Sequence, residues 1–131
     1  MRPAACMRDP TGVPLTCLIV DDNASFLDAA AGLLTGEGVT IVGVALATAE
    51  ALRKSKELHP DVVLVDIMLG SESGIDLAHQ LAEGNPGGPA IILISTHAEE
   101  EFVELIQEAP VAGFVPKSEL SASAIRRLAG I

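Results

Sequence analysis

The sequence predicts an α/β protein built on a parallel sheet with helices on both faces, and three observations support this class. Five short apolar runs alternate with segments whose apolar residues recur at helical spacing. The run Val62–Asp66 is apolar at four consecutive positions, which is typical of a strand buried on both faces. A chain of 131 residues is long enough for one such domain.

The predicted strands all belong to one domain, residues 15–131. The preceding residues, 1–14, hold three prolines and a glycine without hydrophobic periodicity, so we expect a flexible arm there. Five strands are predicted: Leu15–Val20, Thr40–Ala45, Val62–Asp66, Ala90–Ser95 and Gly113–Pro116.

Each predicted helix shows an amphipathic stripe and a signal at one of its ends. Asn23 or Ser25 is expected to cap the first helix, and Ser118 or Ser121 the last. The segment IMLGSESG, between the third strand and the third helix, is expected to be a loop. In chain order the stripes are Phe26, Ala30, Leu33 and Leu34; Ala51, Leu52, Ser55 and Leu58; Ile75, Ala78, Leu81 and Ala82; Phe102, Leu105, Ile106 and Ala109; and Ala124, Ile125 and Leu128.

Right-handed crossovers between parallel strands leave few topologies for this order of elements. We favour the flavodoxin-like (βα)5 three-layer sandwich with strand order 2-1-3-4-5. In that order the first and third strands are central, and their carboxyl ends meet at one edge of the sheet. Asp21, Asp22 and Asp66 would then lie together, with Ser95 and Lys117 at the ends of the neighbouring strands.

Composition and charge limit the classes of partner. A formal net charge of −10 opposes direct binding to nucleic-acid backbones and to anionic membranes. Neither a signal peptide nor an apolar run of about 20 residues is visible. The two cysteines are too few for a disulfide framework, so we expect a cytoplasmic protein.

The clustered residues suggest a chemistry that none of them indicates alone. Three carboxylates in one place repel each other unless a divalent cation lies among them, and oxygen ligands favour Mg²⁺. A carboxylate can also accept a phosphoryl group as a nucleophile. Lys117 could supply positive charge to that group and Ser95 a hydroxyl. Taken singly, each residue has an ordinary explanation as a helix cap, a turn residue or a solvated side chain.

Four segments in order resemble the receiver domain of two-component response regulators. LIVDD matches the acidic pair of that family, VVLVDIMLGSESG its phosphoacceptor segment, IILIST its hydroxyl-bearing strand end, and AGFVPKSEL its lysine segment. The resemblance extends over residues 15–129. It implies that Asp66 is phosphorylated, that Asp22 binds Mg²⁺ directly and Asp21 chiefly through water, and that the main-chain carbonyl of Met68 completes the protein ligands.

The same resemblance implies a switch. Ser95 would bind the phosphoryl group by a hydrogen bond, Lys117 would pair with it, and Phe114 occupies the position of the family's switch aromatic. The chain departs from the family at Gly70, where proline is common, and at Ser118, where proline often follows the lysine.

The expected partners also follow from the resemblance. A sensor histidine kinase or a phosphotransfer protein would donate the phosphoryl group, and a downstream protein or an output domain would respond. The face formed by the fourth helix, fifth strand and fifth helix would change, and it could also join two copies of the chain. We expect no direct contact with nucleic acid or membrane through this domain. No enzymatic activity is expected beyond self-catalysed phosphoryl acceptance and autodephosphorylation.

Two other classes remain open from the residues. An aspartate-nucleophile phosphatase or phosphotransferase shares the reactive carboxylate, but such enzymes place a second Asp two residues later, where this chain has Met68. A flavodoxin-like flavin binder would need a phosphate-binding loop after the first strand, where Asp21 and Asp22 would repel the phosphate.

Overall fold

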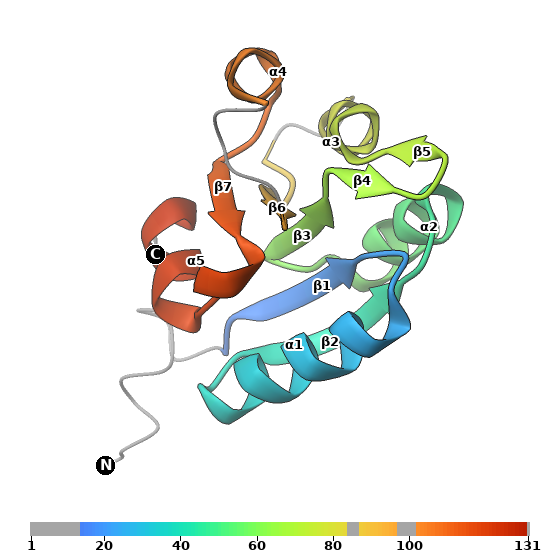
Figure 1. Cartoon of the computed structure of the whole chain (residues 1–131). Helices are drawn as coiled ribbons and strands as arrows, with labels where there is room; N and C mark the ends of the chain where they lie inside the picture. The colour runs from blue at the N-terminus through green and yellow to red at the C-terminus, as the bar shows by residue number, and fades with distance from the viewer. Residues whose placement is uncertain (1–13, 84–86, 97–101, 131) are drawn as a thin grey trace.

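A single parallel sheet lies between two layers of helices in the computed structural model, which describes residues 14–83, 87–96 and 102–130 (Figure 1). Its strands pair in the order β2-β1-β3-β6-β7, and every neighbouring pair is parallel. The predicted flavodoxin-like order and three-layer architecture are therefore confirmed. The strands are β1 (Thr16–Val20), β2 (Thr40–Ala45), β3 (Val62–Asp66), β6 (Ala90–Ser95) and β7 (Gly113–Pro116).

Two hydrophobic clusters, one on each face of the sheet, explain the layering. The cluster beneath α1 and α5 and the one beneath α2 and α3 each take alternate side chains of β1, β3 and β6. All five residues of β3 are buried, as its unbroken apolar run predicts. The helices are α1 (Ala24–Gly36), α2 (Thr48–Leu58), α3 (Gly74–Ala82), α4 (Val103–Glu108) and α5 (Ala122–Ala129).

Side-chain caps set the starts of three helices. The side chains of Asn23, Ser73 and Ser121 each accept a hydrogen bond from the main-chain NH three residues later, at 3.1, 3.3 and 3.0 Å. Of the two predicted caps for the first helix, Asn23 is therefore the one that acts. A 3-10 turn, Lys117–Glu119, precedes the cap of α5.

The segment predicted as a loop after β3 contains a small antiparallel hairpin, so that prediction was wrong. Its strands are β4 (Met68–Leu69) and β5 (Glu72–Ser73). Gly70 in the turn has a φ of +62°, a conformation that glycine adopts easily and that proline cannot adopt. Two-residue strands are too short to show the alternation by which strands are predicted.

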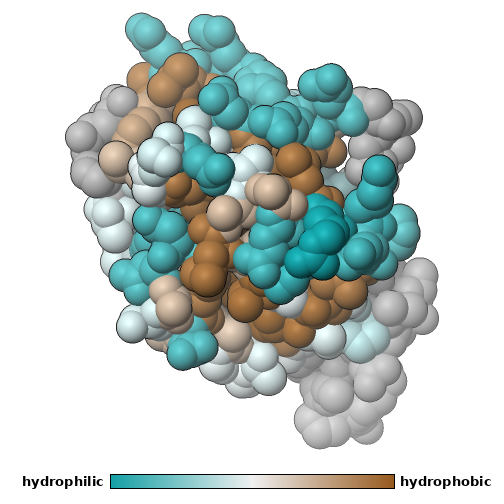
Figure 2. All heavy atoms as spheres, turned by 90° about the vertical axis from the view of Figure 1, so that its right-hand side faces the viewer, coloured by the Kyte–Doolittle hydropathy of each residue, from teal (hydrophilic) through white to brown (hydrophobic). Residues whose placement is uncertain are grey.

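Three residues of the predicted helix stripes are exposed instead. Leu33, Leu58 and Leu105 expose 45%, 41% and 55% of their surface. Leu33 and Leu105 lie at the margin of the stripe that faces the sheet, and Leu58 is the last residue of α2. In α1 the buried residues are Leu27, Ala30 and Leu34. Figure 2 shows the side of the molecule that lies at the right in Figure 1, where hydrophobic atoms reach the surface between hydrophilic ones. Apolar atoms make up more than half of the surface of a typical folded protein. Among the described residues, no helix has the length and hydropathy that a bilayer crossing requires.

Gly74, the first residue of α3, lies directly against the end of β3. Its main-chain NH donates to the carbonyl oxygen of Ile67 at 2.8 Å. A Cβ atom at this position would overlap the carbonyl oxygen of Asp66, which is main chain and cannot turn away. The close approach of α3 to the carboxyl end of β3 therefore requires glycine.

We expect Gly74→Ala to lower the free energy of unfolding by about 2–3 kcal/mol, because the new methyl group must push α3 away from β3. Urea unfolding followed by circular dichroism measures this change. Gly32→Ala is the matched control, because Gly32 lies in α1 with open space around it. That variant should gain about 0.5–1 kcal/mol from helix propensity. Equal stability of the two variants would contradict the close approach.

Candidate functional site

Three aspartates meet at the carboxyl edge of the sheet. Asp21 follows β1 and Asp66 ends β3, and these strands are neighbours in parallel register. One carboxylate oxygen from each of Asp21, Asp22 and Asp66 lies within 4.8 Å of the others. Asp21 and Asp66 are buried, whereas Asp22 is exposed. The structure thus brings together the three acids that the sequence analysis placed at this edge.

Lys117 lies between the two buried carboxylates. Its Nζ atom is 2.6 Å from Asp21 Oδ2 and 3.1 Å from Asp66 Oδ2. Because Lys117 directly follows β7, its side chain reaches the cluster from the far side of β6. One ammonium group therefore faces three carboxylates, which leaves a formal excess of two negative charges in the pocket.

Main-chain groups fix the other oxygens of the two buried carboxylates. The NH of Asn23 donates to Asp21 Oδ1 at 2.8 Å, and the NH of Met68 donates to Asp66 Oδ1 at 3.1 Å. The NH of Ile67 donates to the Ile94 carbonyl at 3.0 Å, which extends the pairing of β3 with β6 beyond Asp66. The carboxylate positions are thus set by the backbone of the strand ends.

The pKa of Asp66 is raised above its usual value. Burial is the largest cause, and the nearby charge of Asp21 acts in the same direction, whereas the Met68 NH and Lys117 act against it. Burial alone would lower the pKa of Lys117, but its ion pairs with Asp21 and Asp66 outweigh burial and raise it. The ammonium therefore stays charged, while the acids repel each other.

The chemistry of this pocket fits a divalent cation. Asp21 Oδ2 is fully buried and, within the described part of the chain, makes no well-aligned hydrogen bond, although the Lys117 ammonium is close. An extra cation would neutralise the excess charge, and the three donors are the hard oxygens that Mg²⁺ and Ca²⁺ prefer. The residues present could therefore hold such an ion.

The remaining predicted residues come from β4, β6 and β7. Ser95 is 1% exposed at the end of β6, one residue beyond Ile94, which pairs with Asp66. Phe114 is half-buried in β7, where it packs against the cluster beneath α2 and α3. Met68 follows Asp66 by two residues, in β4, and is 52% exposed.

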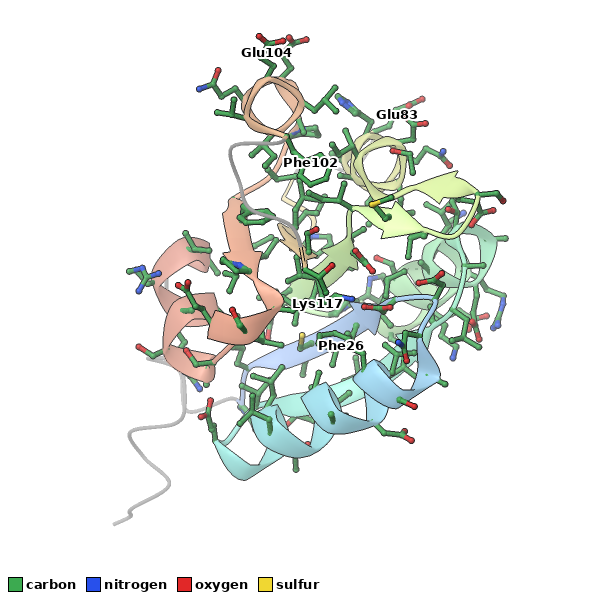
Figure 3. All side chains as sticks on the ribbon, in the orientation of Figure 1. Phe26, Glu83, Phe102, Glu104 and Lys117 are labelled. Atoms are coloured by element: carbon green, nitrogen blue, oxygen red, sulfur yellow. The ribbon has the colours of Figure 1, made fainter. Side chains whose placement is uncertain are left out.

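One further residue belongs to the site, although the sequence analysis did not place it there. Phe26, predicted only as part of a helix stripe, lies against the Lys117 ammonium (Figure 3). Its position four residues after Asp22 could have indicated this, because the first turn of a helix returns to the strand end before it. Outside the acid cluster, Glu72 in β5 accepts a hydrogen bond from the Thr48 NH at 2.9 Å and so ties the hairpin to the start of α2.

Comparisons with known proteins agree on one family. Residues 17–128 match the family model of the response regulator receiver domain. The chain is 36% identical over 99 residues to the "Probable transcriptional regulatory protein TcrX" of Mycobacterium tuberculosis, covering 74% of this chain and 41% of TcrX. It is 31% identical over 90 residues to the chemotaxis protein CheY of Thermotoga maritima, covering 69% of this chain and 75% of CheY.

A solved structure supports the same grouping. A chain of the CheX-CheY-BeF3-Mg complex from Borrelia burgdorferi superposes with a TM-score of 0.72 at 29% identity, covering 90% of this chain and 88% of that one. The first curated relatives are longer proteins, since this chain spans less than half of their length.

The raised pKa of Asp66 predicts how stability varies with pH. The folded state holds this proton more tightly than the unfolded chain, so the ionised carboxylate lowers stability. This loss of stability is absent at pH values below 3.8, the usual pKa of the carboxyl group, and is complete above the raised pKa of the folded state. Asp66→Asn should therefore be more stable than the wild type at pH 7, and its advantage should shrink as the pH falls toward 3.8.

Urea titrations at several pH values, followed by circular dichroism because the chain has no tryptophan, measure this difference. Asp28→Asn, on the exposed face of α1, serves as the control for the loss of one carboxylate. An advantage for Asp66→Asn that stays constant as the pH falls would contradict the raised pKa.

Proposed function

The chain belongs to the receiver domain family of two-component response regulators, and from this premise we propose that Asp66 is its phosphoryl acceptor. Receiver domains are signalling switches of the CheY kind, and response regulators act with histidine kinases and output targets. The observation that supports Asp66 most directly is its place in the pocket. It is the buried acid at the end of the central strand β3, in contact with Lys117 and beside two more acids.

The transfer that we propose is an in-line displacement at phosphorus. A carboxylate oxygen of Asp66 forms a bond to the phosphorus of a kinase phosphohistidine while the bond from phosphorus to the imidazole nitrogen breaks. The electron pair leaves on that nitrogen, which takes up a proton. Lys117 stabilises the charge on the phosphoryl oxygens, and the Ser95 hydroxyl binds one of them. Later attack by water on the acyl phosphate releases phosphate and restores Asp66.

We infer that Mg²⁺ is the ion for this pocket. Asp22 and Asp66 would bind it directly, Asp21 chiefly through water, and the main-chain carbonyl of Met68 would complete the protein ligands. When bound, the ion neutralises charge on the acids and on the phosphoryl oxygens. The similar Borrelia burgdorferi complex contains both BeF3 and Mg, which supports this choice of ion.

The proposed response lies on the α4-β7-α5 side of the sheet. The new charge and acceptor oxygens on Asp66 draw Ser95 and Lys117 toward them, and Phe114 turns inward as Ser95 moves. Among its described residues, α4 has none that is buried, so this side offers little resistance to rearrangement. This face would carry the signal to a partner, to a second copy or to an output domain.

The wider context is also a proposal. Residues 15–131 would form the receiver domain, and the predicted arm lies outside the described residues except for Pro14. A histidine kinase or phosphotransfer protein would donate the phosphoryl group in the cytoplasm. Because the first curated relatives are longer, either an output domain or a separate protein could respond. We expect no turnover of a separate substrate.

We expect the wild-type protein to gain one phosphoryl group from phosphoramidate in the presence of Mg²⁺. Intact mass spectrometry at successive times measures the modified fraction. Asp66→Asn should remain unmodified, and a metal chelator should slow the wild type, because the pocket then keeps its negative charge. Asp28→Asn should react like the wild type. Modification of Asp66→Asn would show that Asp66 is not the acceptor.

Beryllofluoride, which mimics the acyl phosphate, tests the switch separately. With Mg²⁺ it should shift the backbone NMR signals around Asp66, Ser95 and Phe114, and these shifts should vanish in Asp66→Ala. In Ser95→Ala the signals near Asp66 should still move, whereas those near Phe114 should move much less, since the hydroxyl links the two. Unchanged wild-type spectra would remove the switch proposal.

A further inference from the structure

The ammonium group of Lys117 has a third neighbour besides the two carboxylates. Its Nζ atom lies over the ring of Phe26, 4.3 Å from the ring centre. Figure 3 shows the two side chains turned toward each other, one from the start of α1 and the other from the end of β7. At this distance the electron-rich face of an aromatic ring attracts a cation.

The ring is held in place by the same turn that holds Asp21. The Asn23 NH donates to Asp21 Oδ1, and Asn23 Oδ1 in turn accepts from the Phe26 NH at 3.1 Å. The ring is half-buried and packs against the cluster between the sheet and the helices α1 and α5. The position of the ring is therefore fixed relative to the acids.

A phenyl ring suits this place because it attracts the ammonium without offering a ligand atom. Lysine can donate three hydrogens, and among the described residues Asp21 and Asp66 lie within ion-pair distance of its Nζ atom. A polar side chain in place of the ring would add a third acceptor, which would compete with a phosphoryl oxygen for the ammonium. It would also present an oxygen to a metal ion. The ring does neither.

We propose that Phe26 is a positioning residue for phosphoryl transfer to Asp66, and that its ring holds the Lys117 ammonium at the acid pocket while leaving a donor free for the phosphoryl oxygen. This role rests on the proposed function of Asp66. A ring that merely filled space in the core could be replaced by another apolar side chain of similar size without effect on the reaction.

The first test needs neither metal nor phosphate. In metal-free protein, the side-chain CH2 groups next to Lys117 Nζ should show upfield NMR shifts from the Phe26 ring current. The shift should disappear in Phe26→Leu and persist in Phe26→Tyr, which keeps the ring. Wild-type signals without a ring-current shift would overturn the proposed contact.

The second test separates attraction from packing. With phosphoramidate and Mg²⁺, Phe26→Leu should be phosphorylated between about twofold and tenfold more slowly, the range expected for one cation–ring contact. Phe26→Tyr should restore the rate. Trifluorophenylalanine at position 26 keeps nearly the same shape but weakens the negative ring face, so it should be slow like Phe26→Leu. Thermal unfolding of each variant verifies that it is folded.

The outcomes distinguish the two proposals. If the wild type takes up no phosphoryl group, the proposed function fails, and the role of Phe26 fails with it. If the wild type is phosphorylated but the trifluorophenylalanine protein reacts at the wild-type rate, the ring acts by packing alone. In that case the positioning role is overturned and Asp66 remains the acceptor. Should Phe26→Leu fail to fold, the tyrosine and trifluorophenylalanine proteins still decide the question.

Discussion

Two buried carboxylates that share one ammonium group are the constraint on which the rest of this structure depends. Asp21 and Asp66 are almost fully removed from water, and Lys117 lies within 3.1 Å of an oxygen of each. Buried charge is costly unless it is paired and hydrogen-bonded. The pairing is incomplete, because one ammonium cannot neutralise three acids. The pocket is therefore held in place but still attracts cations, which suits the proposed uptake of an ion and a phosphoryl group together.

Main-chain NH groups, rather than additional side chains, hold the two buried carboxylates in place. Each buried carboxylate accepts a hydrogen bond from the NH two residues later, so the turn after each strand holds its own acid. Gly74 lets α3 begin against the carbonyl of Asp66, and Glu72 ties the intervening hairpin to α2. These contacts fix the carboxylates before any ligand arrives, which reduces the ordering that binding would otherwise require.

The sequence predicted the strands and the acid cluster well, because hydrophobicity alone determines where these strands lie. The unbroken apolar runs predicted four strands with the bounds that the structure shows, and parallel strands then brought Asp21, Asp22 and Asp66 to one edge. The sequence was a poorer guide where an element was very short or where one side chain makes two kinds of contact. The β4-β5 hairpin has two-residue strands, and Leu105 lies at the margin of its stripe. Phe26 packs against the core and also touches Lys117, and periodicity reports only the first of these contacts.

The elements around the pocket are buried to different degrees, and this difference indicates which of them a change at Asp66 would move. Every residue of β3 is buried, whereas β7 has only Val115 buried and α4 has none among the described residues. Moving a two-state equilibrium from 1:99 to 99:1 takes about 5.5 kcal/mol. A local change of charge can therefore rearrange only an element that is held by few buried contacts. Lys117 is covalently joined to β7 through Pro116. If Asp66 is phosphorylated as we propose, a phosphoryl group that re-orients the ammonium acts first on the part of the sheet that resists least, while β3 keeps the Asp66 carboxylate in place.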